Sequence, residues 1–113
     1  ARAALRTAAI QGATKEAALV PLSVMKHVID ALALARVVAE KGNINSVSDA
    51  GVSALMLGAA AEGAAFNVLI NLQSITDPEF SGWRAEEVTT LVRTSRMKTE
   101  EILVLVREKI AAP

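Results

Sequence analysis

Two asparagines stand four residues apart in the otherwise apolar stretch "FNVLINL" at residues 66–72. They are Asn67 and Asn71, and the period of an α-helix places them on the same face. A buried primary amide without a hydrogen-bond partner costs about 1–3 kcal/mol. We therefore expect these two amides to bond to another helix, to a second copy of the chain or to a ligand.

Other polar residues share this helical face. At about 100° per residue Asp49 points in the same direction as Asn67, with Ser53 and Asn71 nearby. One interpretation is a ligand groove along this stripe. The other, which we favour on geometry alone, is that Asp49 and Ser53 serve the start of the helix while the amides bond neighbouring helices. Asp49 and Asn67 would be about 27 Å apart along the helix, so one small site cannot use both.

The remaining candidates for chemistry favour structural roles. His27, the only histidine, could act as a general base, but a solvated surface histidine is the favoured interpretation. Glu62 could be a catalytic carboxylate, or it could pair with a basic residue on a packed helix, which we favour. Phosphate-binding loops and metal-ligand spacings are absent. The scattered cations could hold an anionic ligand tail, but solvated helix faces are expected for Arg6, Lys15, Arg93, Arg96 and Lys98.

Three long helices are expected to position these residues. The first runs from Arg2 to Lys41 and ends at Gly42, a good helix terminator. Pro21 in its middle predicts a kink or two abutting helices, because proline removes a backbone donor. After Pro21 an apolar stripe at three- and four-residue spacing predicts the buried face, which comprises Val20, Val24, Val28, Ala31, Ala35 and Val38.

The second helix is predicted from about Val47 to Leu72. Its expected start is a capping box, with Ser46 as the N-cap and Asp49 reaching back. The third helix is predicted from Pro78 to about Ala111, with Asp77 as its cap. Because no strand-like alternation appears, the predicted fold is all-α, an up-and-down bundle of long helices.

The second helix is apolar nearly all round, so it must be central in whatever bundle forms. It is long enough to span a bilayer. Glu62 at its middle, and the lack of flanking basic clusters or an aromatic belt, favour a buried helix of a soluble protein instead. Three or four helices can shield a central helix partly, but not on every side. We therefore expect an oligomer, a missing segment, or both.

Composition narrows the possible functions. The 113 residues suit a single domain, and twelve basic residues balance twelve acidic ones. No net positive field is present to attract nucleic acid or an anionic membrane, and neither is expected as a partner. The chain has no cysteine, which excludes disulfides and a cysteine nucleophile. This composition is compatible with the cytoplasm, where we expect the protein.

Three stretches together resemble a known family. They are "AALVPLSV" at 17–24, "KGNINSVSDAGV" at 41–52 and "GAAFNVLINLQSITD" at 63–77. Their order and spacing resemble the formiminotransferase-cyclodeaminase family, which includes cyclodeaminase domains and free-standing methenyltetrahydrofolate cyclohydrolases. The likeness extends over nearly the whole chain.

The resemblance implies a helical bundle that interlocks with a second copy as a dimer. It also implies a tetrahydrofolate derivative as substrate, with no tightly bound cofactor. The expected reaction is cyclisation of 5-formiminotetrahydrofolate to 5,10-methenyltetrahydrofolate with release of ammonia, or hydrolysis of the methenyl ring. Ser48, Asp49, Asn67 and Asn71 are carried over by position as substrate-binding or helix-start residues, and no catalytic residue is assigned.

The resemblance covers only the later part of that family's domain. Residues 1–113 are therefore expected to form one helical domain, the C-terminal part of a cyclodeaminase-like domain without its N-terminal helices. The glycine-rich motif and the acidic helix that the family has upstream are missing from it. The alternative to an enzyme is a non-catalytic helical dimerisation module that retains part of the enzyme fold.

Overall fold

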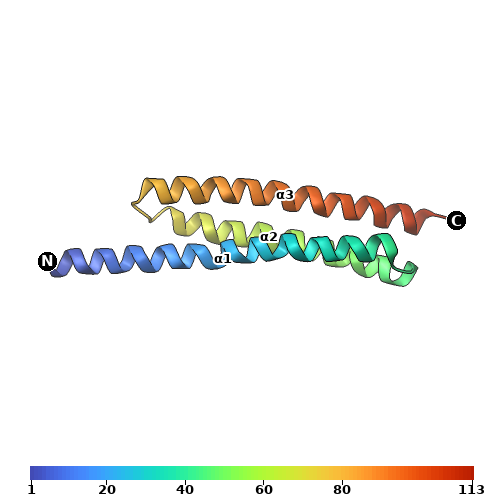
Figure 1. Cartoon of the computed structure of the whole chain (residues 1–113), viewed down its shortest axis with the longest axis horizontal. Coiled ribbons are helices and arrows are strands. Elements are labelled where there is room, and N and C mark those ends of the chain that lie inside the picture. Colours follow the sequence, from blue (N-terminus) through green and yellow to red (C-terminus); the bar gives the residue numbers. More distant parts are fainter.

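The computed structural model describes residues 1–113 and consists of three long α-helices joined by two short connections. Helix α1 spans Arg2–Lys41, α2 spans Ile44–Leu72 and α3 spans Pro78–Ala111. The helices run up, down and up along one long axis, so the two termini lie at opposite ends of the molecule (Figure 1). The predicted all-α, up-and-down bundle of long helices is confirmed.

Helix α1 has the bounds that the sequence predicts and passes through Pro21 as one continuous helix. The alternative of two abutting helices at Pro21 is therefore wrong. Alanine and leucine are strong helix formers, and their abundance on both sides of Pro21 offsets the one hydrogen bond that proline removes. The helix ends at Gly42, whose N–H donates to the Val38 carbonyl at 2.7 Å.

Helix α2 begins three residues earlier than the sequence predicts. Its N-cap is Asn43, whose Oδ1 accepts hydrogen bonds from the backbone N–H groups of Asn45 at 3.0 Å and Ser46 at 3.1 Å. The predicted capping box of Ser46 and Asp49 is wrong, because both residues lie inside the helix. Asparagine is as good an N-cap as serine, so the earlier of two competing caps fixes the start.

The connection between α2 and α3 is held against α1 by side chains. Gln11 donates from Nε2 to the Ser74 carbonyl at 2.9 Å, and its Oε1 accepts the Thr76 N–H at 2.9 Å. Asp77 is the N-cap of α3 as predicted, accepting from the Phe80 N–H at 3.2 Å. The Asp77 carboxylate also pairs with the Lys15 ammonium at 2.8 Å. These contacts fix where α1 lies along the α2–α3 hairpin.

The core consists of two apolar clusters along the long axis, and alanine supplies much of both. Alanine buries little area per residue, so helices packed on it approach closely but gain little apolar burial for each contact. The first cluster contains Val28, Leu32, Ala35, Ala39, Val47, Ala50, Ala54, Ala61, Ile102 and Val106. The second contains Ala18, Leu22, Met25, Ala64, Ala65, Val68, Leu72, Ile75 and Val88.

The predicted buried stripe of α1 is largely wrong. Of its members only Val28 and Ala35 are buried, while Val20 is 66% exposed. The observed buried face is instead Ala18, Leu22, Met25, Val28, Leu32, Ala35 and Ala39. Because apolar residues occur all round α1, its sequence supports more than one stripe, and contact with α2 and α3 selects this one.

The molecule is elongated and exposes much apolar surface. Its extents are 72 × 18 × 16 Å and its radius of gyration is 18.4 Å, against about 13 Å for a compact domain of this length. Its accessible surface of 7123 Å² exceeds the roughly 5,900 Å² expected for a monomer of this mass. Large apolar side chains that no neighbouring helix covers contribute to this surface, among them Leu5, Leu34, Met56, Phe66 and Ile70.

Helices α1 and α2 are both long and apolar enough to cross a membrane by length and composition alone. The core helices of soluble proteins meet the same criterion, so two such helices are weak evidence for a membrane protein.

Candidate functional site

A groove of about 720 Å³ lies between α1 and α2, and both predicted asparagines line it. One wall comes from a single face of α1 around Pro21, and the other from α2. The floor residues of α2 are small, which keeps the groove open. The full lining is Ala17, Val20, Pro21, Val24, Ala60, Gly63, Ala64, Asn67 and Asn71. We call this the α1–α2 groove.

Asn67 and Asn71 are the polar side chains of the α1–α2 groove, and they differ in their bonding. Asn71 donates from Nδ2 to the backbone carbonyl of Asn67 at 2.8 Å, which leaves its Oδ1 as an acceptor. The Asn67 side chain makes no hydrogen bond within the chain. The expected bonding of the two amides to a neighbouring helix is therefore not what the structure has. Together they offer a ligand both donors and acceptors.

Ser48 and Asp49 lie far from this groove, near the other end of α2. The Ser48 hydroxyl donates to the Asn45 carbonyl at 3.1 Å, inside the first turns of the helix. The Asp49 side chain is exposed and makes no ion pair with a neighbour. The structure thus brings Asn67 and Asn71 together and does not bring Ser48 and Asp49 to them. A substrate-binding role for the second pair remains a prediction.

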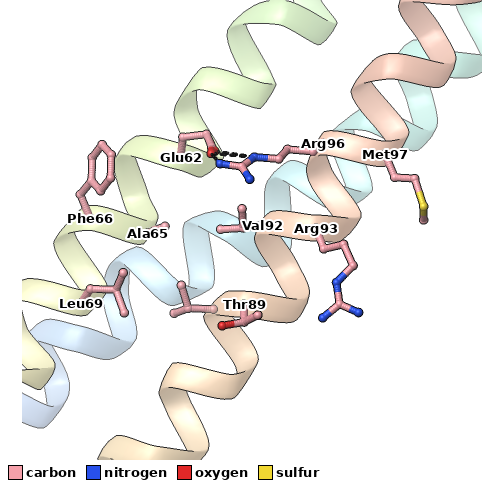
Figure 2. Close-up of a pocket in the computed structure, with 10 residues that line it drawn as sticks. Glu62, Ala65, Phe66, Leu69, Thr89, Val92, Arg93, Arg96 and Met97 are labelled. Atoms are coloured by element: carbon pink, nitrogen blue, oxygen red, sulfur yellow. Dashed lines mark hydrogen bonds and ion pairs between the residues drawn. The ribbon is translucent and has the colours of Figure 1, made fainter.

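A second groove, of about 730 Å³, lies between α2 and α3. Figure 2 shows its polar contact, the Glu62 carboxylate facing the Arg96 guanidinium across the two helices. The Arg96 Nε lies 3.0 Å from Glu62 Oε1 and 3.2 Å from Oε2, and its terminal nitrogen also contacts Oε1. The lining is Glu62, Ala65, Phe66, Leu69, Val88, Thr89, Val92, Arg93, Arg96 and Met97.

The Glu62–Arg96 pair confirms the structural interpretation of Glu62. An exposed carboxylate–guanidinium pair of this kind contributes about 0–1 kcal/mol to stability. Phe66 on the rim is 72% exposed. The α2–α3 groove therefore has an apolar lining and a compensated charge, with Arg93 as its one unpaired cation. It holds no group poised for acid–base chemistry.

Charged residues elsewhere also join helices. Glu87 of α3 accepts from Arg84 at 2.5 Å and pairs with Lys26 of α1 at 3.2 Å. Burial alone would raise the pKa of the Glu87 carboxyl, but hydrogen bonds from Arg84 and Lys26 outweigh it and lower the pKa below its usual range. Arg84 also stacks on Trp83, 3.7 Å from the ring centroid. His27 is exposed, as expected for a surface histidine.

The sequence misses the apolar wall that faces the asparagines. Val20 and Val24 are predicted as core residues, yet both line the α1–α2 groove and are largely exposed. The signal that could identify them is Pro21 itself, because a proline inside an amphipathic helix often marks a face that does not pack normally. The fold and the groove together define an all-helical protein with an amide-lined groove between two long helices.

Comparison with known proteins identifies the family. A family model described as Formiminotransferase-cyclodeaminase matches residues 1–90. Since this match covers most of the chain, the chain belongs to the formiminotransferase-cyclodeaminase family, as the three sequence stretches predict.

Curated relatives agree with this assignment. The chain is 38% identical over 107 residues to the methenyltetrahydrofolate cyclohydrolase of Methylorubrum extorquens. The aligned residues cover 95% of the chain and 51% of that protein. It is 35% identical over 106 residues to the formimidoyltransferase-cyclodeaminase of Gallus gallus, covering 94% of the chain and 20% of the relative. The enzyme of the same name from Rattus norvegicus is 35% identical over 100 residues, covering 88% of the chain and 18% of the relative.

The chain thus spans about half the length of the bacterial relative and about a fifth of the length of the animal ones.

Proposed function

We propose that the chain is part of a folate-dependent one-carbon enzyme domain and that the α1–α2 groove binds a tetrahydrofolate derivative. One observation carries the proposal. Two of the three family-like stretches, 17–24 and 63–77, line this groove from α1 and α2, and Asn67 and Asn71 are the polar side chains that the second stretch contributes. The three relatives bear the names methenyltetrahydrofolate cyclohydrolase and formimidoyltransferase-cyclodeaminase, which support the same substrate class.

The proposed reaction is one of two that use the same carbon. In the cyclodeaminase reaction, N10 of 5-formiminotetrahydrofolate attacks the formimino carbon, and the bond to the terminal nitrogen breaks once that nitrogen is protonated, releasing ammonia. In the cyclohydrolase reaction, water adds to the methenyl carbon and the ring opens. Both pass through a tetrahedral carbon between two nitrogens, so both need proton transfer by a general acid and base.

The proton-transfer groups would come from outside the groove lining. None of the nine lining residues titrates near neutral pH, since all are aliphatic, proline, glycine or asparagine. Neutral amides can orient a heterocycle by hydrogen bonds but cannot exchange protons with it at pH 7. In the proposal, Asn67 and Asn71 position the pterin end, and a carboxylate supplied by another segment or another copy transfers the proton.

A second copy of the chain, or a larger homo-oligomer, is part of the proposal. The surface in excess of that expected for a compact monomer is roughly 1,200 Å², and a standard interface buries about 800 Å² on each partner. The excess within the accessible surface of 7123 Å² is therefore large enough for one such interface. We place residues 1–113 in one helical domain, the C-terminal part of a cyclodeaminase-like domain, acting in the cytoplasm.

Equilibrium binding of 5-formyltetrahydrofolate, measured by isothermal titration calorimetry, tests the proposal. We expect Asn67→Ala and Asn71→Ala each to weaken binding about 3- to 10-fold, the equivalent of one net hydrogen bond. Gln73→Ala is the matched control, because Gln73 is an exposed amide beyond the end of α2 and outside the groove. Its affinity should equal that of the wild type.

Two results would contradict the proposal. One is the absence of binding at millimolar ligand by a chain that is folded and assembled, which would favour the non-catalytic dimerisation module. The other is an equal loss of affinity in Gln73→Ala, which would remove the α1–α2 groove as the binding site.

A further inference from the structure

Pro21 lies in the middle of α1 on the wall of the α1–α2 groove. In an α-helix each carbonyl accepts a hydrogen bond from the N–H four residues later. Pro21 has no N–H, so the Ala17 carbonyl lacks its usual donor. Ala17 and Pro21 both line the groove. A backbone acceptor without its helical partner therefore borders the same groove as the two asparagine amides.

The position of this carbonyl follows from helix geometry. Residues 17, 20, 21 and 24 share one face of a helix, and backbone carbonyls point towards the C-terminal end. The Ala17 oxygen thus lies beside the Pro21 ring, which takes the place of the usual donor without supplying an N–H. Val20 and Val24 flank it with apolar surface, and Asn67 and Asn71 line the opposite wall. The groove consequently combines an apolar slot with one backbone acceptor and two amides.

We infer that the Ala17 carbonyl is a recognition group, which accepts an N–H from the ring of the bound ligand. This inference rests on the proposed function and names the edge of the ligand that hydrogen-bonds to the groove. A pterin ring carries a lactam, whose N–H needs an acceptor and whose carbonyl needs a donor. The Ala17 carbonyl supplies the acceptor and the Asn67 amide supplies the donor. Pro21 is a positioning residue, because its missing N–H keeps the carbonyl available.

Pro21→Ala provides a test in which loss of binding cannot arise from unfolding. Alanine restores the N–H, closes the helical hydrogen bond to Ala17 and raises helix propensity, so thermal unfolding should shift to higher temperature. We expect binding of 5-formyltetrahydrofolate to weaken at least fivefold in this more stable protein. Affinity is measured by calorimetry and unfolding by circular dichroism.

Two control variants separate the carbonyl from other effects. Gly12→Ala also favours helix in α1, but an added Cβ meets nothing within 4 Å and Gly12 lies outside the groove. Its affinity should stay within twofold of the wild type. Val20→Ala trims the apolar wall and leaves the Ala17 carbonyl as it is, so its loss should be smaller than that of Pro21→Ala.

The outcomes are distinct. A Pro21→Ala affinity within twofold of the wild type, or a loss equal to that of Val20→Ala, overturns the role of the carbonyl while the proposed folate site stands. Failure of the wild-type chain to bind 5-formyltetrahydrofolate overturns the proposed function and this inference with it.

Discussion

Asn67 and Asn71 carry the same side chain but play different parts in the α1–α2 groove. The Asn71 amide is anchored by its hydrogen bond to the Asn67 carbonyl, so its Oδ1 is presented in a fixed direction. Asn67 makes no such bond and can turn to offer either its donor or its acceptor. The groove thus presents one fixed amide and one that can adapt its orientation.

Asp77 makes the stability of the chain depend on pH. Its hydrogen bond from Lys15, and that from the Phe80 N–H, lower the pKa of the Asp77 carboxyl below its usual value. The stabilisation is therefore fully present above the pKa of the unfolded chain and is lost as the pH falls through the lower folded-state value. Asp77→Asn retains an N-capping side chain but removes the charge.

We expect Asp77→Asn to lower the thermal midpoint at pH 7, with the difference from the wild type shrinking as the pH falls to about 2. Glu87, whose pKa is also lowered, titrates in both proteins, so subtracting the two curves isolates Asp77. Thermal unfolding followed by circular dichroism measures it. A difference that stays constant from pH 7 to pH 2 would contradict the assignment.

Individual residues were predictable where their role is local. The Asp77 cap, the surface position of His27 and the shared face of Asn67 and Asn71 all follow from spacing along one helix. The Arg96 partner of Glu62 could be predicted only as a basic residue on a packed helix, since its identity depends on how α3 aligns with α2. The exposure of Val20 was missed for the same reason.

Glycines in α2 show how closely the helices approach at different points. A Cβ added at Gly51 would lie 3.0 Å from Val106 Cγ1, whereas one added at Gly63 would meet nothing within 4 Å. Gly51 is thus a close-contact position between α2 and α3. Gly63 is an open position on the α1–α2 groove.

The two alanine substitutions should have opposite effects on stability. Gly63→Ala should raise the free energy of unfolding by about 1 kcal/mol through helix propensity. Gly51→Ala gains the same propensity but overpacks against a β-branched side chain, which costs about 1–3 kcal/mol, so we expect no gain and a net loss of up to about 2 kcal/mol. Urea unfolding at 25 °C measures both. Equal stabilisation by the two changes would show that α2 and α3 can separate freely at Gly51.

At the scale of elements, the bounds of α1 and α3 were predictable and the packing faces were not. Caps and breakers such as Gly42, Asp77 and Pro78 act locally and leave clear signals. The start of α2 was misplaced because Asn43 and Ser46 are both good caps, and the sequence does not rank them. The buried face of α1 was misjudged because an alanine-rich helix is apolar in several directions.

The whole molecule is elongated and is not a compact globule, as is typical of a subunit within a larger assembly. We expect size-exclusion chromatography with light scattering to give at least twice the 11.8 kDa chain mass in the absence of detergent. The physical reason is the uncovered apolar surface of α1 and α2, represented by Leu34, Met56 and Phe66. A stable 11.8 kDa monomer at tens of micromolar would contradict self-association. Solubility only in detergent would instead favour a membrane location.

Gln11 helps to fix the position of α1 along the α2–α3 hairpin. Alanine seams are smooth, so polar contacts between the helices help to fix how they align along their axes. The Gln11 amide opposes axial displacement of α1, because it hydrogen-bonds both the Ser74 carbonyl and the Thr76 N–H. Pro21 lies ten residues further along the same helix. The Gln11 contacts therefore also influence which residues of α1 lie opposite Asn67 and Asn71. The alignment of the two walls of the α1–α2 groove therefore depends in part on Gln11, which lies about 15 Å from Pro21 along α1.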